Sequence, residues 1–340
     1  SKDAGAGLAK DPELQAQMMN VMGRVYTNLG LYPHAQSLVE QAVDVRRHLL
    51  GPENPETLKS ATLLGTILES EGHFAEAEKL LRETLDAERR VVGPEHPDTL
   101  YAMTWLAMTL TAEGRYSEAE KLQRETLDIE RRVLGPEHPD TLGSMSDLVD
   151  TLRLEGHYPE AEKLGRETLD IRRRVLGPEH PSTLISMDYL GNTLISEQRY
   201  PEAEKLYRET LDIERPVLGL EHRITLTSMG DLANILEAEG HYADAEKLQR
   251  EVLDIRRRVL GPNHPDTALS TYNLACFAAR EDKRDEAISL LREAIDHGLA
   301  PEADLQVEKD PDLKSLHGDP RFDAIVTDAK QHVAAAQKPN

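Results

Sequence analysis

The sequence predicts an all-α protein, a solenoid of stacked helix pairs, from its length, its composition and an internal repeat. The chain has 340 residues, more than one compact core usually holds. Aromatic residues make up 4% and charged residues 30%, which leaves too few large side chains for two ordinary globular cores. Two motifs recur together every 42 residues, a period typical of helical arrays.

The repeat defines the organisation of the chain. One motif is Gly-Pro, and the other is Ala-Glu-Lys-Leu. Gly-Pro stands at positions 51, 93, 135, 177 and 261, with Gly219-Leu220 in the remaining register; Ala-Glu-Lys-Leu begins at 77, 119, 161, 203 and 245, with degenerate copies from 35 and 287. About seven units therefore span residues 13–298, between an N-terminal extension over 1–12 and a C-terminal cap and tail over 299–340.

Each unit is predicted to contain two helices, called here helix A and helix B. In the second unit, apolar residues at helical spacing occupy 58–68, are interrupted by Glu71-Gly72-His73, and resume over 74–85. This pattern indicates helix A, a short turn and helix B, and the same order is expected in every other unit.

The segment between units is expected to stop one helix and start the next. Gly93 suits the left-handed conformation at a helix C-terminus, and Pro94 prevents the helix from continuing. Pro97 loses no helical hydrogen bond in a first turn, and Asp98 complements the positive helix end. The Gly-Pro-Glu-His-Pro box is therefore interpreted as helix punctuation.

Two columns of helix A predict how the helices pack. Small residues at one position allow close approach to helix B, and Val149 is the one bulky exception, so looser packing is expected there. The preceding column is apolar throughout and requires a neighbouring unit to bury it. The small column is Gly23, Gly65, Ala107, Gly191, Ala233 and Ala275, and the apolar column is Met22, Leu64, Leu106, Leu148, Leu190, Leu232 and Leu274.

The repeat changes after residue 298, where the pattern predicts a terminal cap. A solenoid needs a segment that covers the apolar side of its last unit. Leu313, Leu316 and Phe322 are expected to lie on that unit.

These motifs resemble the tetratricopeptide repeat family. The resemblance rests on the Leu-Gly or Leu-Ala pair in helix A, on Gly-x-Phe or Gly-x-Tyr at residues 72–74, 156–158 and 240–242, and on the Ala and Leu of helix B. The 42-residue unit looks like the lengthened variant of kinesin light chains. The resemblance implies a right-handed superhelix whose concave face, lined by A helices, binds peptides or proteins.

Two alternatives to a free-standing binding scaffold remain open. Residues 11–14 and 26–32 are similar to repeat regions attached to bacterial serine/threonine kinases, so the chain is alternatively a sensor or regulatory region of a larger signalling protein. No kinase signature occurs in the sequence itself. The other alternative is a self-assembling structural module whose repeat ends stack head to tail.

Charge and composition exclude several classes of partner. Forty basic and 62 acidic residues give a formal charge of −22, which opposes binding to nucleic acid and to anionic lipid. No apolar run is long enough for membrane insertion, and no signal segment is apparent, which leaves the compartment open while favouring the cytoplasm. The single cysteine, Cys276, excludes an internal disulfide framework.

The sequence also argues against catalysis. The five histidines at 96, 138, 180, 222 and 264 occupy one structural column, and units about 10 Å apart cannot bring them to one metal ion. Cys276 fits a small buried thiol, and the Glu/Arg runs fit the solvated face of helix B. We therefore expect no enzyme activity, metal, cofactor or small-molecule substrate.

The candidate binding residues are the helix A positions that line the groove in the resembling family. Unlike the structural columns, these positions vary from unit to unit. They are Asn20, Arg24, Asn28, Lys59, Thr62, Glu69, Tyr101, Trp105, Met108, Asp147, Asp150, Arg153, Asp188, Tyr189, Asn192, Asp231, Asn234, Glu237, Tyr272, Asn273 and Arg280.

The central units combine aromatic and acidic residues at these positions. Tyr101, Trp105 and Tyr189 alternate with the aspartates of the fourth to sixth units. This pattern predicts an extended peptide partner that carries Lys or Arg and an apolar anchor, with Asn192 and Asn234 available to its backbone. The alternative is that the aspartates only solvate the wall of the groove, or that Trp105 packs inside the solenoid.

Overall fold

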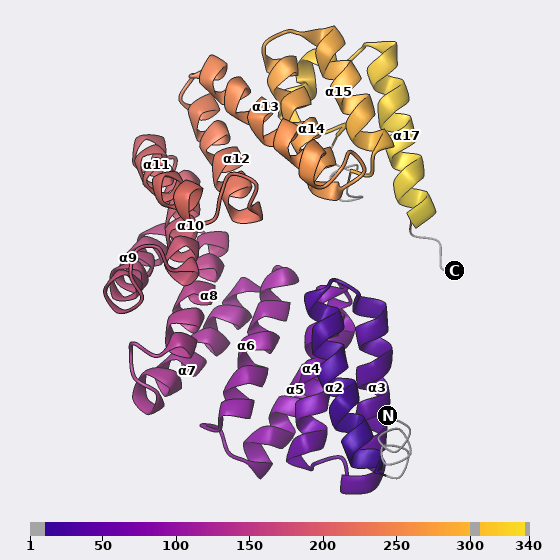
Figure 1. The fold of residues 1–340 in the computed structure, drawn as a ribbon, viewed down its shortest axis with the longest axis vertical. Helices are drawn as coiled ribbons and strands as arrows, with labels where there is room; N and C mark the ends of the chain where they lie inside the picture. The colour runs from indigo at the N-terminus through magenta and orange to yellow at the C-terminus, as the bar shows by residue number, and fades with distance from the viewer. Residues whose placement is uncertain (1–10, 300–306, 337–340) are drawn as a thin grey trace. The chain divides into compact units, whose positions relative to one another are not determined.

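The computed structural model describes residues 11–299 and 307–336, and these residues form helices and connecting turns without a strand. Seven helix pairs follow one another in the order that the repeat predicts (Figure 1). The chain divides between Val175 and Leu176 into two compact units, each made of several repeats and called here unit 1 and unit 2. From here on, one helix pair is called a repeat. The predicted array of repeats is confirmed within each of the two units.

Unit 1 contains four helix pairs. Its A helices are α2, α4, α6 and α8, and its B helices are α3, α5, α7 and α9. Their bounds are α2 Pro12–Asn28, α3 Tyr32–Leu50, α4 Pro55–Ser70, α5 Phe74–Val91, α6 Pro97–Ala112, α7 Tyr116–Val133, α8 Pro139–Glu155 and α9 Tyr158–Val175. Successive A helices also contact one another, which makes the A layer the more tightly packed layer of this unit.

Unit 2 contains three further pairs and the cap. The pairs are α10 Pro181–Ser196 with α11 Tyr200–Val217, α12 Arg223–Ala238 with α13 Tyr242–Val259, and α14 Pro265–Arg280 with α15 Arg284–Asp296. A 3-10 helix, η1 Pro311–Leu316, and α17 Pro320–Ala336 follow. Leu313, Leu316 and Phe322 join the buried cluster of α14 and α15, so the expected cap is confirmed.

The punctuation between the pairs works as predicted, with one addition. Gly93 adopts φ +100°, and Gly219 keeps φ +89° although leucine follows it instead of proline. The addition concerns the histidine column: His96 Nδ1 accepts a hydrogen bond from the backbone N–H of Asp98 at 3.2 Å. The same cap occurs at His138, His180, His222 and His264. Each imidazole accepts a hydrogen bond from a backbone N–H group that the first turn of the helix leaves free, a role usually taken by Ser, Thr, Asp or Asn.

The small-residue column allows helix A and helix B to approach closely. A Cβ added at Gly65 would lie 2.7 Å from Leu81 Cδ2, and one added at Gly191 would lie 2.5 Å from Tyr207 Cε2. Each pair joins a glycine on helix A to a large side chain 16 residues later on helix B. Helix B of the same repeat therefore leaves no room for a methyl group at these two positions of helix A.

The expected loosening at Val149 is wrong. Val149 is 1% exposed, and α8 contacts α9 as extensively as α6 contacts α7. The helix B position that faces this column is occupied by Gly165, which is also buried. Because the bulky residue has moved from helix B to helix A, the summed volume at the contact is preserved.

Candidate functional site

Unit 1 presents an exposed aromatic ring beside a partly buried one. On α6, Tyr101 is 47% exposed, whereas Trp105 packs against the buried cluster of Leu81 and Leu106. The two rings meet edge to face, with centroids 6.1 Å apart and an interplanar angle of 71°. Tyr101 is therefore the accessible aromatic group, and Trp105 supports it from the core side.

The acidic residues of α8 divide into a paired and an isolated carboxyl group. Asp150 Oδ1 accepts a hydrogen bond from Arg153 Nη2 at 2.7 Å, so the charge of Asp150 is neutralised by an arginine of the same helix. Asp147 is half-buried, and its pKa is raised to about 6. Burial is the larger cause and the charge of Asp150 the smaller one, whereas the charge of Arg172 lowers the pKa. A carboxyl group in this state gains from a cationic partner.

Several polar residues predicted on this face instead tie repeats together. Asn20 Nδ2 donates to Ser60 Oγ at 2.8 Å, and Lys59 Nζ lies 3.2 Å from Glu56 and 3.4 Å from Asp98. Arg24 and Asn28 of α2 are exposed, and Met108 and Glu69 are half-buried. Thr62 is 2% exposed and donates to Glu88, so the expectation that it lines a groove is wrong.

Unit 2 brings three carboxyl groups into mutual electrostatic contact. They come from Asp188 on α10, Glu214 on α11 and Asp231 on α12. Burial is the largest influence on each, and it raises the pKa of Asp188 to about 8, that of Glu214 to about 7 and that of Asp231 to about 6. Glu214 is 0% exposed, whereas both aspartates are half-buried. The group therefore extends from the core to the surface of the A helices.

The remaining predicted residues of unit 2 fall into three environments. Asn234 is exposed, and Tyr189 and Asn273 are half-buried. Asn192 Oδ1 accepts from the Tyr207 hydroxyl, and Arg280 lies 3.1 Å from Glu237, which is 9% exposed. Tyr272 is 7% exposed and donates to Asp310 of the cap, so its expected place in a groove is wrong: it anchors the cap.

Sequence reasoning missed two exposed apolar residues of unit 2 that share the column of Lys59 and Tyr101. They are Ile185, 39% exposed, and Leu269, 43% exposed. Counting in steps of 42 residues from Tyr101 reaches both, so the repeat itself carries the signal. They supply apolar surface next to the acidic residues of the A helices.

A second missed feature is a charged residue at one inward position of helix B in six successive repeats. The column is Arg46, Glu88, Glu130, Arg172, Glu214 and Arg256. The glutamates are 0–3% exposed, and each leaves Oε2 without a hydrogen-bond partner. The arginines reach backbone carbonyls: Arg46 donates to Glu56 O, Arg172 to Leu142 O and Arg256 to Asp266 O. Charged residues are rarely buried, so the polar contacts of these side chains must offset the free energy that their burial costs.

Possible metal ligands converge within 4.8 Å at two places in the described part of the chain. One is Glu120, Glu155 and His157 at an A/B turn, and the other is Cys276, Asp310 and Asp312 under the cap. In the second group, burial raises the pKa of the Cys276 thiol, and Asp310 already caps η1, so this group performs structural work. The three carboxyl groups of unit 2 do not converge in this way.

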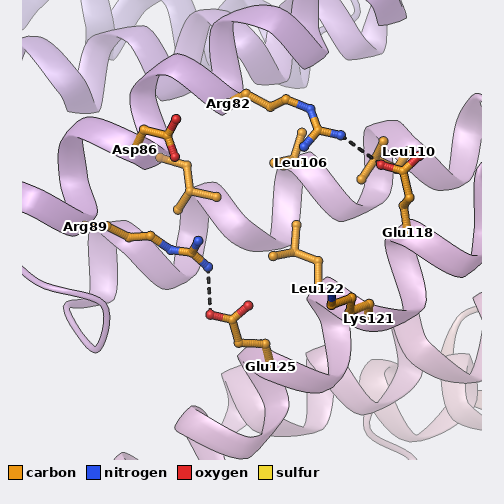
Figure 2. A pocket seen from close by; sticks show the side chains of 10 residues that line it. Arg82, Asp86, Arg89, Leu106, Leu110, Glu118, Lys121, Leu122 and Glu125 are labelled. Atoms are coloured by element: carbon orange, nitrogen blue, oxygen red, sulfur yellow. Dashed lines mark hydrogen bonds and ion pairs between the residues drawn. The ribbon is translucent and has the colours of Figure 1, made fainter.

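The B helices of unit 1 carry a hollow of about 320 Å³, lined by residues of α5, α6 and α7. Figure 2 shows Arg82 reaching Glu118 and Arg89 reaching Glu125 across it, with N–O distances of 3.2 and 2.7 Å. Leu106 and Leu122 lie between these two ion pairs. The predicted solvated face of helix B is thus also a set of ion pairs between repeats.

Comparison with protein-family models identifies the repeat. Models described as tetratricopeptide repeat match residues 14–90, 98–174, 146–215, 62–132 and 225–266. No curated protein matches the chain. In the described residues, no helix is both long enough and apolar enough to span a bilayer.

Solved structures with the same fold include a Podosopora anserina putative kinesin light chain with nearly identical TPR-like repeats. It is 27% identical, with a TM-score of 0.55, and the match covers 60% of this chain and 96% of that one. BtubC (BKLC) from P. vanneervenii is 19% identical, with a TM-score of 0.56 over 66% of this chain and 91% of that one. A Rap protein complexed with Competence and Sporulation Factor is 11% identical, with a TM-score of 0.61 over 96% and 88%.

Proposed function

The chain belongs to the tetratricopeptide repeat family, in its kinesin-light-chain-like form, and on that premise we propose that it is a non-catalytic scaffold for a basic, partly apolar peptide segment. Each of the two compact units carries a binding surface of its own, the exposed side of its A helices, called here the A face. The observation that carries the proposal is that half-buried carboxyl groups and exposed apolar side chains occur together on the A helices: Asp147 and Tyr101 in unit 1, and Asp188 and Ile185 in unit 2.

Both halves of this pairing favour the same ligand chemistry. A carboxyl group whose pKa is raised by burial is stabilised in its charged form by an approaching ammonium or guanidinium group. An exposed ring or branched aliphatic side chain gains about 25 cal/mol for each Å² of apolar surface that a ligand covers. A peptide with alternating basic and apolar residues satisfies both requirements, whereas an acidic peptide lacks the cation that the carboxyl groups require.

Selection from a displayed random peptide library against the intact chain tests this proposal. We expect enrichment of Arg or Lys within a few residues of an aromatic or branched aliphatic residue. The matched selection uses Asp147→Asn, Asp188→Asn, Asp231→Asn, which keeps the side-chain shapes and removes the charge. Enrichment of acidic peptides, or of the same peptides by both proteins, would refute the proposal.

A second candidate function is self-association through α2. Val21, Val25 and Leu29 are 58%, 52% and 66% exposed, and Met18 and Met22 are exposed beside them. In α4, the residues equivalent to Val21 and Val25 are Leu63 and Ile67, which α3 buries. The occupant that we assign is the α2 of a second copy, because it offers the same apolar face and makes an isologous contact.

Sedimentation distinguishes this candidate from a monomeric scaffold. A head-to-tail stack would need an apolar surface on α17 as well, and the described outward residues Arg321, Asp323 and Lys330 of α17 are polar. We expect a dimer that Val21→Glu, Val25→Glu converts to a monomer. A sedimentation coefficient that does not change with concentration, or an equal effect of Asp323→Lys, would exclude the α2 contact.

A further inference from the structure

The acidic group of unit 2 has more hydrogen-bond acceptors than the surrounding side chains can satisfy. Ser228 Oγ lies 3.1 Å from Glu214 Oε1 and 3.5 Å from Asp188 Oδ1, and a hydroxyl carries one hydrogen. Glu214 Oε2 is buried and has no hydrogen-bond partner. A fully buried carboxyl oxygen in this state costs free energy unless a proton or an external donor reaches the group.

The same shortage occurs at Tyr207, whose side chain is 1% exposed. Its hydroxyl oxygen lies 3.1 Å from Asn192 Oδ1 and 3.3 Å from Asp231 Oδ2, so one phenolic hydrogen again faces two acceptors. Burial and the charges of Asp231 and Asp188 raise the pKa of Tyr207, which keeps it a donor. The two hydroxyl groups together serve three carboxyl groups and one amide oxygen.

One internal cation of unit 2 faces this group, and it is engaged elsewhere. Arg256 of α13 donates to Asp266 O at 3.2 Å and to Ser270 Oγ at 2.7 Å, and its charge partly offsets that of Asp231 alone. Neither Asp188 nor Glu214 has a basic group of unit 2 among the influences on its pKa. Within unit 2, the Asp188 and Glu214 pair is therefore the part of the group whose charge no basic side chain offsets.

The spread of the three carboxyl groups indicates the shape of the missing donor. Their oxygen atoms do not converge within 4.8 Å, as they do at the two possible metal-ligand groups, so a single ion would not contact all three. A guanidinium group presents five N–H donors in one plane and bridges acceptors that one metal ion or ammonium group cannot. Asp188 and Asp231 are half-buried and so remain accessible from the A face, with Glu214 beneath them.

We propose that Asp188 and Asp231, backed by Glu214, Ser228 and Tyr207, form a binding subsite for the guanidinium group of one arginine side chain of the peptide partner. This subsite rests on the proposed function, because it specifies arginine at one position of the peptide that the A face is proposed to bind. The arginine donates to both aspartates, and its charge compensates the buried glutamate. Ile185, one turn before Asp188 on α10, is the nearest apolar contact for the adjacent peptide residue.

Unit 1 contains an incomplete copy of this arrangement. Two repeats earlier, Glu130, Ser144 and Asp147 occupy the positions of Glu214, Ser228 and Asp231. Thr104 stands at the position of Asp188 and donates to Leu100 O, and Gln123 stands at that of Tyr207. Because the accessible second carboxylate is missing, unit 1 lacks the bridge that a guanidinium group requires.

The acidic group also makes binding depend on pH. With the pKa of Asp188 raised to about 8 and that of Glu214 to about 7, the empty subsite holds protons near neutral pH. A guanidinium group favours the ionised carboxylates, so binding releases protons and strengthens as the pH rises from 6 to 8. The ionised fraction of a group with a pKa near 8 rises at least about tenfold over this range, and the affinity follows it.

The test uses three tripeptide amides as probes: acetyl-Ala-Arg-Ala, its lysine analogue and its uncharged citrulline analogue. Each is titrated into the full chain to about 20 mM and followed by NMR shifts, a range that detects Kd values in the millimolar class. We expect the arginine probe to bind at least about threefold more tightly than the lysine probe, because a bidentate contact is lost with lysine. The citrulline probe should not bind.

Two amide substitutions assign the binding to this subsite. Asp188→Asn should weaken the arginine probe at least about tenfold and flatten its pH dependence, because an amide neither ionises nor compensates the ligand charge. Asp212→Asn, on the exposed side of helix α11 and outside the A face, is the matched control and should leave binding unchanged. Both variants are first shown to keep the thermal unfolding transition of the wild-type chain.

The opposite results would overturn the subsite. These are binding of citrulline equal to that of arginine, no binding of arginine at the highest concentration, or an equal loss in the two variants. If library peptides still bind the A face without an arginine that depends on Asp188, the subsite fails and the proposed function stands. If the library yields no peptide for the A face, the proposed function fails.

Discussion

At the residue scale, the unusual feature of this chain is a set of buried carboxyl groups at fixed positions of the repeat. Glu88 and Glu214 occupy the same helix B position three repeats apart, are 0–1% exposed and contact a hydroxyl through one oxygen only. In Glu88, burial and then the charge of Asp98 raise the pKa to about 8. These groups keep a proton in the folded chain that they lose at a lower pH when unfolded.

The folded chain should consequently lose stability as the pH rises. A group with a folded pKa near 8 and an unfolded pKa near 4.5 stabilises the fold fully below pH 4.5. Its contribution declines as the pH increases to 8. Between pH 5.5 and pH 8.5, we expect the free energy of unfolding of the Glu88→Gln variant to fall by about 1–3 kcal/mol less than that of the wild-type chain. Urea unfolding at the two pH values measures it, and a variant with the same decline as wild type would contradict the assignment.

At the element scale, two local devices hold the helices in place: histidine caps and complementary pairs of small and large residues. His138 Nδ1 accepts from the backbone N–H of Asp140 at 3.3 Å, at the start of α8. The small-and-large pairs include Gly191 with Tyr207, where a Cβ on the glycine would overlap the ring. Both devices recur in the same register, so each can be tested in one repeat against the others.

The histidine cap predicts a contrast between two substitutions. His138→Ala leaves the first backbone N–H groups of α8 without their acceptor and should destabilise the chain by about 1 kcal/mol. His138→Asn supplies a carbonyl oxygen at a similar place, as Asn54 does at the start of α4, and should cost less than about 0.5 kcal/mol. Thermal unfolding measures both, and equal losses would show that the imidazole acts by packing.

The 16-residue offset that joins Gly65 to Leu81 places Gly165 opposite Val149, which predicts a compensating pair of substitutions. Val149→Gly leaves a cavity and should cost about 2–4 kcal/mol, and Gly165→Val overfills the same space and should cost about 1–3 kcal/mol. The double variant exchanges the two side chains, as in the repeat with Gly65 and Leu81. We expect it to recover more than half of the summed loss, and strictly additive losses would show that the residues do not face each other.

At the scale of the whole molecule, periodicity accounts for most of what the sequence predicted. The number and order of the helix pairs follow from spacings of 42 residues, and the terminal cap follows from the end of that repeat after residue 298. The prediction at Val149 is wrong because the space at a helix A position depends also on the residue that faces it on helix B. The small residue Gly165 occupies that facing position and compensates for the larger side chain of Val149.

The candidate site was less predictable because a position on helix A does not specify its partners. Asp147 and Asp150 look equivalent in sequence, yet Arg153 neutralises only Asp150. Tyr272 shares a groove position with Asp188, but the cap buries it against Asp310. Glu214 and Tyr207 lie on helix B, outside the helix A positions at which the family resemblance places binding.

Isothermal titration of the best library peptide against two matched variants tests the A face most directly. One variant is Asp147→Asn, Asp188→Asn, Asp231→Asn on the A helices, and the other is Arg82→Gln, Arg89→Gln at the hollow between the B helices. We expect the first to weaken binding at least about a hundredfold, since each charged contact contributes about 1.5–3 kcal/mol, and the second to bind as wild type does. Unchanged affinity in the first variant, or loss in the second, would place the binding surface elsewhere than on the A helices.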